Sequence, residues 1–152
     1  MTSASGEPPG SPELPPSVRF ADERRRRWLL VRGRGEQPLD APVRASDIRA
    51  HSSSKRPAVQ RGDEAILYAA VWQCVFGVVD VVGDPENDPD RTRWAWRFPI
   101  RPTLLVSDLH DAPPVESAGI FPQSLWRHSH IRLTDEQFDT ARTLIDAVGS
   151  AA

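Results

Sequence analysis

Two tryptophans alternate with arginines in one short stretch, RTRWAWRFPI, which occupies residues 91–100. Tryptophan rings stack on nucleobases and arginine side chains contact phosphates, so the stretch could form a platform for nucleic acid. The same residues also fit a strand, because Trp94, Trp96 and Phe98 recur at every second position and share one face, with arginines on the other. Aromatic faces of strands are usually buried, so we expect Trp96 and Phe98 to pack inside the domain.

No pattern in the sequence predicts catalysis or a bound metal. The chain contains no G-x-S-x-G motif, no phosphate-binding P-loop and no dinucleotide fingerprint. His128 and His130 would point the same way from a strand and could share a metal ion, but the sequence fixes no third ligand. The acidic run DPENDPD, residues 84–90, lacks the central glycine and closing glutamate of a calcium loop. We therefore expect no metal, no cofactor and no enzymatic activity.

The composition suits a single domain of 152 residues with a net charge of −2. Because the chain is not basic as a whole, any nucleic-acid site must be a local patch. Lys55 is the only lysine, so arginine supplies the remaining positive charge, and Cys74 is the only cysteine, which excludes a disulfide framework. No apolar run could span a membrane and the N-terminus lacks the apolar segment of a signal peptide, so we expect a soluble cytoplasmic protein.

The hydrophobic pattern predicts a disordered tail and one folded domain. Residues 1–22 are rich in proline, serine and glycine, which predicts disorder, and the domain then covers residues 23–152. Strands are expected over RWLLVRG, EAILYAA, WQCVFGVVDVV, RWAWRFPIRPTLLV and LWRHSHIRL. Residues 46–63 are expected to form a short helix or turn, an irregular stretch and a tight turn.

The last part of the chain predicts a helix. Thr134 is an N-cap with a glutamine three residues later, the apolar stripe runs from Phe138 to Val148, and Gly149 ends it. Several short strands followed by one terminal helix indicate an α+β, mostly β fold, namely a small mixed β-barrel closed by a C-terminal helix.

Three stretches in this order resemble the EVE domain, a member of the PUA-like superfamily. They are the Gly-Asp turn and two strands of RGDEAILYAAVWQCVFGVVDVV, the aromatic strand RWAWRFPIRP, and the closing strand and helix of LWRHSHIRLTDEQFDTARTLI. The resemblance covers roughly residues 27–147. It implies a PUA-like barrel with flanking short helices and a pocket at one side. It also implies a non-catalytic role, because relatives of this family accept a modified base of DNA or RNA into that pocket.

The segment before the Gly-Asp turn departs from the family pattern. That pattern commonly has a tryptophan and a Val-Arg-Asn-like run there, whereas this chain has Ser52, Ser53, Ser54, Lys55 and Arg56. Hydroxyl groups and a lysine can still bind a base edge or a phosphate through hydrogen bonds.

The sequence thus predicts a pocket between the HSSSKR segment and the start of the LWRHSH strand. In it, Trp126 would stack on a base, Ser53 or Ser54 would read the base edge, and Lys55 with Arg56 would hold the phosphate. Trp126 could instead only cap the barrel. The candidate ligand-binding residues are Trp28, Ser52, Ser53, Ser54, Lys55, Arg56, Tyr68, Trp94, Trp126 and His128.

Two functions follow from these observations. The first is a binding module for a modified nucleobase or nucleotide in DNA or RNA, which the four consecutive arginines at residues 24–27 and the tryptophan content favour. The second is a small-molecule sensor or protein-interaction module on the same fold, which the acidic balance and the altered segment favour.

Overall fold

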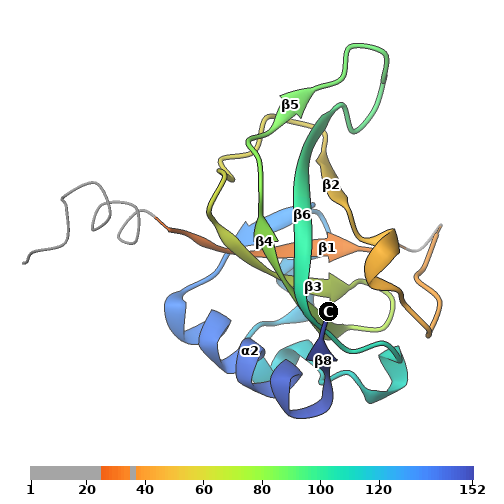
Figure 1. Ribbon diagram of the computed structural model, residues 1–152, viewed down its shortest axis with the longest axis vertical. Helices are drawn as coiled ribbons and strands as arrows, with labels where there is room; N and C mark the ends of the chain where they lie inside the picture. The colour runs from red at the N-terminus through yellow and green to blue at the C-terminus, as the bar shows by residue number, and fades with distance from the viewer. Residues whose placement is uncertain (1–24, 35–36) are drawn as a thin grey trace, which may run out of the picture.

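The computed structural model describes residues 25–34 and 37–152, so the predicted tail, residues 1–22, lies outside the described residues. A strongly curled sheet forms the body of the domain, and one long helix packs against it (Figure 1). This arrangement confirms the predicted α+β, mostly β fold, a small barrel with a C-terminal helix.

The sheet has eight strands in the order β2-β6-β4-β3-β1-β7, and β5 and β8 both pair with β6. The pair β1–β3 is parallel, whereas the other pairs are antiparallel. The strands are β1 (Arg27–Arg32), β2 (Ala50–Ser53), β3 (Glu64–Ala69), β4 (Cys74–Val81), β5 (Glu86–Asn87), β6 (Trp96–Leu105), β7 (His130–Arg132) and β8 (Ser150–Ala151). Short 3-10 helices cover Ala45–Asp47, Leu109–Asp111, Val115–Ala118 and Pro122–Ser124, and α2 covers Asp135–Val148.

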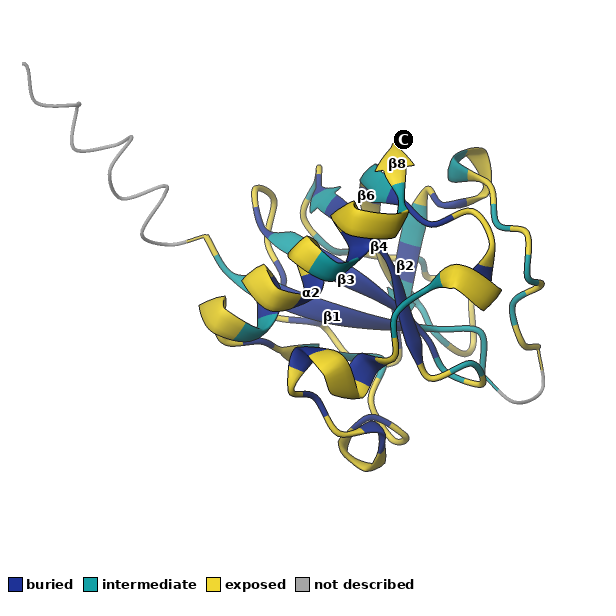
Figure 2. Ribbon diagram, turned by 90° about the horizontal axis from the view of Figure 1, so that it is seen from below, coloured by how far each residue is buried: buried dark blue, intermediate teal, exposed yellow. Residues whose placement is uncertain are grey.

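The core lies on both sides of the central strands. In β1, β3 and β4 the apolar residues run without alternation, and nearly all of them are buried (Figure 2). Continuous burial is expected where a sheet is covered on both faces, here by α2 on one side and by the curl of the sheet on the other. The structure thus confirms the strands predicted over RWLLVRG, EAILYAA and WQCVFGVVDVV, which are β1, β3 and β4.

The helix α2 confirms most of the prediction made for it. Thr134 and Gln137 form both hydrogen bonds of a capping box, at 3.0 and 3.1 Å. Phe138 and Ile145 are buried against the sheet. The prediction that Val148 belongs to the same stripe is wrong, because its side chain lies in the final helical turn and is 52% exposed.

The aromatic strand that includes residues 96–100 is confirmed in part. Phe98 and Ile100 are fully or almost fully buried, as the period of two predicts. Trp94 is outside β6, because its backbone turns into the left-handed region with φ 55°. The prediction that Trp96 packs inside the barrel is wrong. It opens the strand, remains half-buried, and its ring lies 5.6 Å from the Arg56 guanidinium.

Two other segments differ from the prediction. Residues 50–53 form the edge strand β2 within the stretch that we expected to be irregular, because β6 extends far enough to pair with them. The strand expected over residues 125–133 is only three residues long, since residues 122–127 fold into a 3-10 turn instead.

A buried carboxylate fixes the corner where β3 begins. Asp63 follows Gly62, whose φ of +95° suits glycine, and its side chain is almost completely buried. The carboxylate accepts hydrogen bonds from Trp28 Nε1 at 2.9 Å, Arg26 N at 3.1 Å and Gln60 N at 2.9 Å. These bonds tie the starts of β1 and β3 together, so the Gly-Asp turn has a structural role here.

Candidate functional site

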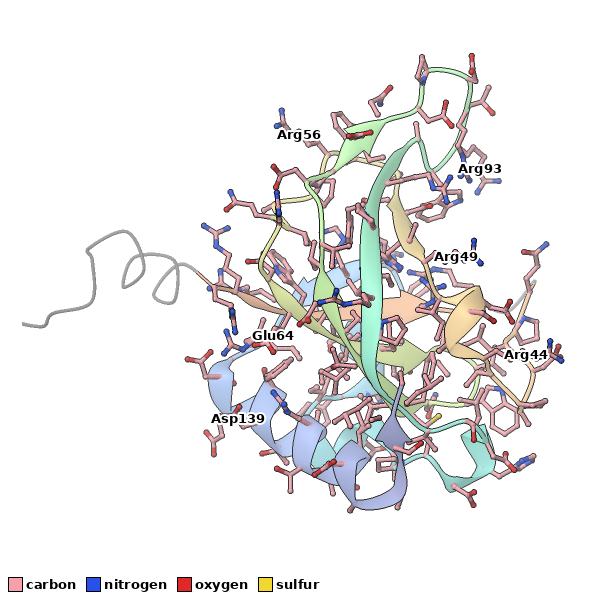
Figure 3. The ribbon with its side chains drawn as sticks, viewed as in Figure 1. Arg44, Arg49, Arg56, Glu64, Arg93 and Asp139 are labelled. Carbon is pink, nitrogen blue, oxygen red and sulfur yellow. The ribbon has the colours of Figure 1, made fainter. Side chains whose placement is uncertain are left out.

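A cleft of about 850 Å³ lies at the carboxyl end of β1. It lies between the edge strand β2 and the loop that leads into β6, where Figure 3 shows Arg93. Its volume is within the range of about 300–1,000 Å³ that is common for ligand sites. We call it the arginine cleft, and its lining is Val31, Arg32, Gly33, Arg34, Gln37, Leu39, Ala50, His51, Ser52, Arg91, Arg93, Trp94 and Ser129.

The charge of this cleft is positive. Its lining contains four arginines, and none of the described lining residues is acidic. Arg32 is the deepest of them, and burial lowers its pKa, although arginine starts so high that the guanidinium stays charged. Arg32 Nη1 donates to the Ala50 carbonyl oxygen at 3.0 Å and lies 3.3 Å from His51 Nδ1. No carboxylate among the described residues forms a salt bridge with Arg32.

The imidazole of His51 supports this guanidinium and is electrically neutral. Burial, followed by the positive charge of Arg32, lowers the pKa of His51 to about 3. His51 Nε2 lies 2.8 Å from the carbonyl oxygen of Ser129, and a carbonyl can only accept, so Nε2 carries the proton. Nδ1 is then the acceptor for Arg32, which holds the arginine in place without neutralising its charge.

The polar network continues behind the cleft through serine hydroxyls. The Ser129 hydroxyl donates to Ser53 Oγ at 3.3 Å and lies 2.8 Å from His130 Nδ1. These contacts join the end of β2 directly to the segment before β7, whereas the sequence predicted that the HSSSKR stretch faces the start of the LWRHSH stretch across a pocket. Ser53 is buried and is not part of the cleft lining. Its hydrogen bond with Ser129 holds the wall of the cleft in place from behind.

Trp94 contributes the only indole ring among the described lining residues of the arginine cleft. Its φ of 55° is unfavourable for a bulky residue and costs roughly 1–3 kcal/mol. Strained backbone of this kind is concentrated at functional sites, where the surrounding structure maintains it. The turn moves the indole out of the line of β6 and places it beside Arg91 and Arg93 at the cleft.

A second hollow of about 220 Å³ lies next to the first one. We call it the Trp126 hollow, and its lining is Val31, Arg34, Tyr68, Ala70, Val71, Gln73, Pro122, Leu125 and Trp126. Arg34 lines both hollows and donates hydrogen bonds to the carbonyl oxygens of Trp126 and His128. It therefore fixes the position of the Trp126 segment relative to the arginine cleft.

The structure separates the residues that the sequence grouped into one pocket. Ser52 and Trp94 line the arginine cleft, whereas Tyr68 and Trp126 line the Trp126 hollow. Trp28 lies in the core with its indole nitrogen bonded to Asp63, so its ring is not available to stack on a ligand.

The remaining predicted residues lie outside both linings. Ser54, Lys55 and Arg56 follow the end of β2 and are exposed, and Arg56 and Arg93 lie on opposite sides of β6 in Figure 3. The predicted phosphate contact through Lys55 and Arg56 therefore lies outside the arginine cleft and the Trp126 hollow. The His128 side chain is exposed, and only its carbonyl group takes part, through Arg34.

Sequence reasoning missed the arginines and the histidine that define the main cleft. A signal was present in the RGRG run after the first strand, because Arg32 and Arg34 flank a glycine at the carboxyl end of a strand. In sheets with parallel strands, ligands commonly bind beyond such ends. No signal in the sequence indicated that residues 91–94 would fold back toward this end.

The described residues contain no group of three or more histidine, cysteine, aspartate or glutamate side chains placed to hold a metal ion. Cys74 is buried, which raises the pKa of its thiol to about 11 and keeps it protonated. In the part of the chain that the structure describes, no helix is long and apolar enough to cross a membrane.

Comparison with known proteins identifies the fold but no function. No model of a known protein family matches the chain, and no curated protein matches its sequence. Among solved structures, protein Atu2648 from Agrobacterium tumefaciens is similar, with a TM-score of 0.55 and 15% identity over 80% of this chain and 95% of that one. Rpa0253 from Rhodopseudomonas palustris is similar as well, with a TM-score of 0.54 and 16% identity over 78% of this chain and 92% of that one. At these identities the likeness concerns the fold alone.

Proposed function

We propose that this protein is a non-catalytic cytoplasmic module that binds a modified nucleobase or nucleotide of DNA or RNA in the arginine cleft. The observation that carries the proposal is the combination of four arginines and one strained tryptophan in a cleft without a described acidic lining residue. The fold family that we propose is the EVE domain of the PUA-like superfamily.

The arginines favour a ligand with negative charge. A half-buried guanidinium without a carboxylate partner is costly, and an anion that binds to it offsets this cost through charge-assisted hydrogen bonds. Arg32 uses one nitrogen for hydrogen bonds with the protein, its other guanidinium nitrogens form none with the described residues, and the residue lines the cleft. Phosphate suits the flat, forked shape of arginine particularly well.

The aromatic and polar groups favour a ligand that is also planar. The Trp94 indole can stack on a base, and Ser52, Gln37 and the guanidinium of Arg32 can form hydrogen bonds with its edge. A nucleotide combines a planar base with a phosphate, so it matches the whole lining better than inorganic phosphate or an apolar molecule does.

The proposal excludes a catalytic step for a chemical reason. Both ring nitrogens of His51 are engaged with protein groups, and its low pKa leaves it a weak base. Ser129 lies beside His130, but no carboxylate among the described residues accepts a hydrogen bond from that imidazole, so the pair lacks the third group of a catalytic triad.

The test is to identify what the protein retains from cells. The protein is incubated with a limited nuclease digest of total cellular RNA and, separately, of genomic DNA, and the bound nucleosides are quantified by mass spectrometry. We expect one modified nucleoside to be enriched over the input. The enrichment should disappear in Arg93→Ala and persist in Arg61→Ala, which removes an exposed arginine that lies outside the cleft lining. A bound fraction with the same nucleoside composition as the input would contradict the proposal.

A further inference from the structure

We infer that the Trp126 hollow is a second subsite, which binds the nucleotide next to the one in the arginine cleft, so that the ligand is a single strand of nucleic acid. This inference rests on the proposed function of the arginine cleft and extends it from one nucleotide to two neighbouring ones. It is carried by the exposure of Trp126, by the charge around it and by its continuity with the first cleft.

The Trp126 hollow presents apolar surface to solvent. The Trp126 side chain is 67% exposed, and Val71 beside it is 54% exposed. Phe121, which precedes the lining residue Pro122, is 70% exposed. These residues are three of the five large apolar residues that are exposed in the described structure. Trp126 and Val71 share one lining, and neighbouring exposed apolar side chains of this kind are typical of a binding surface.

The charges around this surface favour nucleic acid over an apolar peptide. The Arg127 guanidinium lies 4.6 Å from the centre of the Trp126 ring, and Arg34 lies at the boundary of the hollow. None of the described lining residues is acidic. A base stacked on the indole would bring its phosphate close to these guanidinium groups, whereas an apolar peptide would desolvate them without supplying an anion.

The Trp126 hollow is continuous with the arginine cleft. Val31 and Arg34 belong to the lining of both, so the two hollows are adjacent and share a boundary at these residues. Arg34 also holds the backbone of residues 126 and 128 by two hydrogen bonds, which keeps the indole at a fixed place beside the cleft. Neighbouring nucleotides of one strand can therefore occupy the two hollows, one on either side of Arg34.

The size of the Trp126 hollow agrees with a site for one nucleotide of a longer strand. The Trp126 hollow, at about 220 Å³, is smaller than the sites that usually hold a whole ligand, so it suits a single base at the end of a larger molecule. A base can stack on an exposed indole only when it is not paired and stacked within a duplex, which is why a single strand is required.

The experiment compares two lengths of ligand on two tryptophan variants. Mononucleotides and trinucleotides are separated by size from nuclease digests of total cellular RNA and of genomic DNA, and their binding to immobilised protein is measured by titration. The variants are Trp126→Ala, Trp126→Phe, which keeps a stacking ring, and Val148→Ala, which alters an exposed apolar residue outside the lining of both hollows.

We expect the native protein to bind trinucleotides at least several-fold more tightly than mononucleotides. Trp126→Ala should remove that advantage and leave mononucleotide binding unchanged, whereas Trp126→Phe and Val148→Ala should keep the advantage. The inference is wrong if trinucleotides bind no better than mononucleotides, or if Trp126→Ala weakens both equally, and in either case the proposed function stands. If the native protein binds neither fraction, the proposed function fails and the second subsite fails with it.

Discussion

Two charged side chains lie at opposite ends of the parallel pair β1–β3: Asp63 is almost completely buried, and Arg32 is half-buried. Their surroundings differ. Asp63 lies where the two strands begin, and its carboxylate accepts three hydrogen bonds from protein groups. Arg32 lies where β1 ends, and its contacts with the protein involve only one of its nitrogens. The fold supplies three hydrogen bonds to the carboxylate, whereas the guanidinium lines a cleft and retains donors that form no hydrogen bond with the described residues.

The difference separates a structural charge from a binding charge. A buried charge whose hydrogen-bonding capacity is used by the fold stabilises that fold, and its removal leaves several donors without partners. A buried charge with unused donors adds little to stability and can instead bind an ion of opposite charge from solution. Substitutions at the two ends should therefore affect different measurements.

The largest effect is expected at the structural end. Asp63→Ala would leave the Trp28 indole and the backbone amides of Arg26 and Gln60 without their acceptor. We expect a loss of about 3 kcal/mol or more in the free energy of unfolding, measured by denaturant titration. Asp63→Asn keeps one acceptor oxygen and should lose less. An Asp63→Ala protein with native stability would show that this corner is not what holds the two strands together.

At the binding end, Arg32→Met should preserve folding and weaken binding. Methionine fills a similar volume without a charge, so the free energy of unfolding should stay the same or rise. Binding to trinucleotides from the RNA or DNA digest should fall by about ten-fold to a hundred-fold, the value of a hydrogen bond to a charged group. Arg61→Ala serves as the control. Equal binding by Arg32→Met and the native protein would mean that this cation does not contact the ligand.

The neutral state of His51 predicts a pH dependence of stability. Its folded-state pKa of about 3 lies below the unfolded value near 6.5, so the unfolded chain takes up the proton first as the pH falls. The stabilisation is therefore complete above about pH 6.5 and is lost progressively toward pH 3, by roughly 1.4 kcal/mol per pH unit. In His51→Gln this part of the slope should be absent. The measurement is thermal unfolding of both proteins between pH 4 and 7. If the stability of the two proteins falls in parallel as the pH is lowered, the role assigned to His51 is wrong.

The smallest effect on stability is expected at Trp94. Glycine accepts a φ of 55° without strain, which offsets the entropy that it adds to the unfolded chain, so Trp94→Gly should change the free energy of unfolding by less than about 1 kcal/mol. Binding should fall several-fold because the stacking ring is lost. The matched control Gln73→Gly removes another positive-φ residue, at 55°, outside the arginine cleft and should leave mononucleotide binding unchanged.

Local patterns in the sequence predicted the fold better than the site. The capping box at Thr134 and the alternation through Phe98 and Ile100 depend on neighbours a few residues away, so they were readable from the sequence. The burial of Trp96 was predicted wrongly because a local alternation does not show where a strand begins. Trp96 is the first residue of β6 and is only half-buried.

The site depends on contacts between distant parts of the chain. The arginine cleft joins residues 31–39, 50–52, 91–94 and 129, and no local pattern reports that meeting. The sequence predicted that the HSSSKR segment, residues 51–56, faces the start of the LWRHSH strand across a pocket. It placed Trp126 in that pocket as well, whereas the turn of residues 122–127 carries this ring to the neighbouring hollow.

The central claim is that ligand binds at the Arg32 end of the parallel pair and not at the Asp63 end. The most direct measurement is an NMR titration of ¹⁵N-labelled protein with trinucleotides from the RNA and DNA digests, in which the indole signals of Trp94 and Trp28 report on the two ends. We predict that the Trp94 indole and the amides of Gly33, Gln37 and Ser52 shift, and that the Trp28 indole does not. Shifts at Trp28 without shifts at Trp94, or no shifts with either digest, would contradict the account.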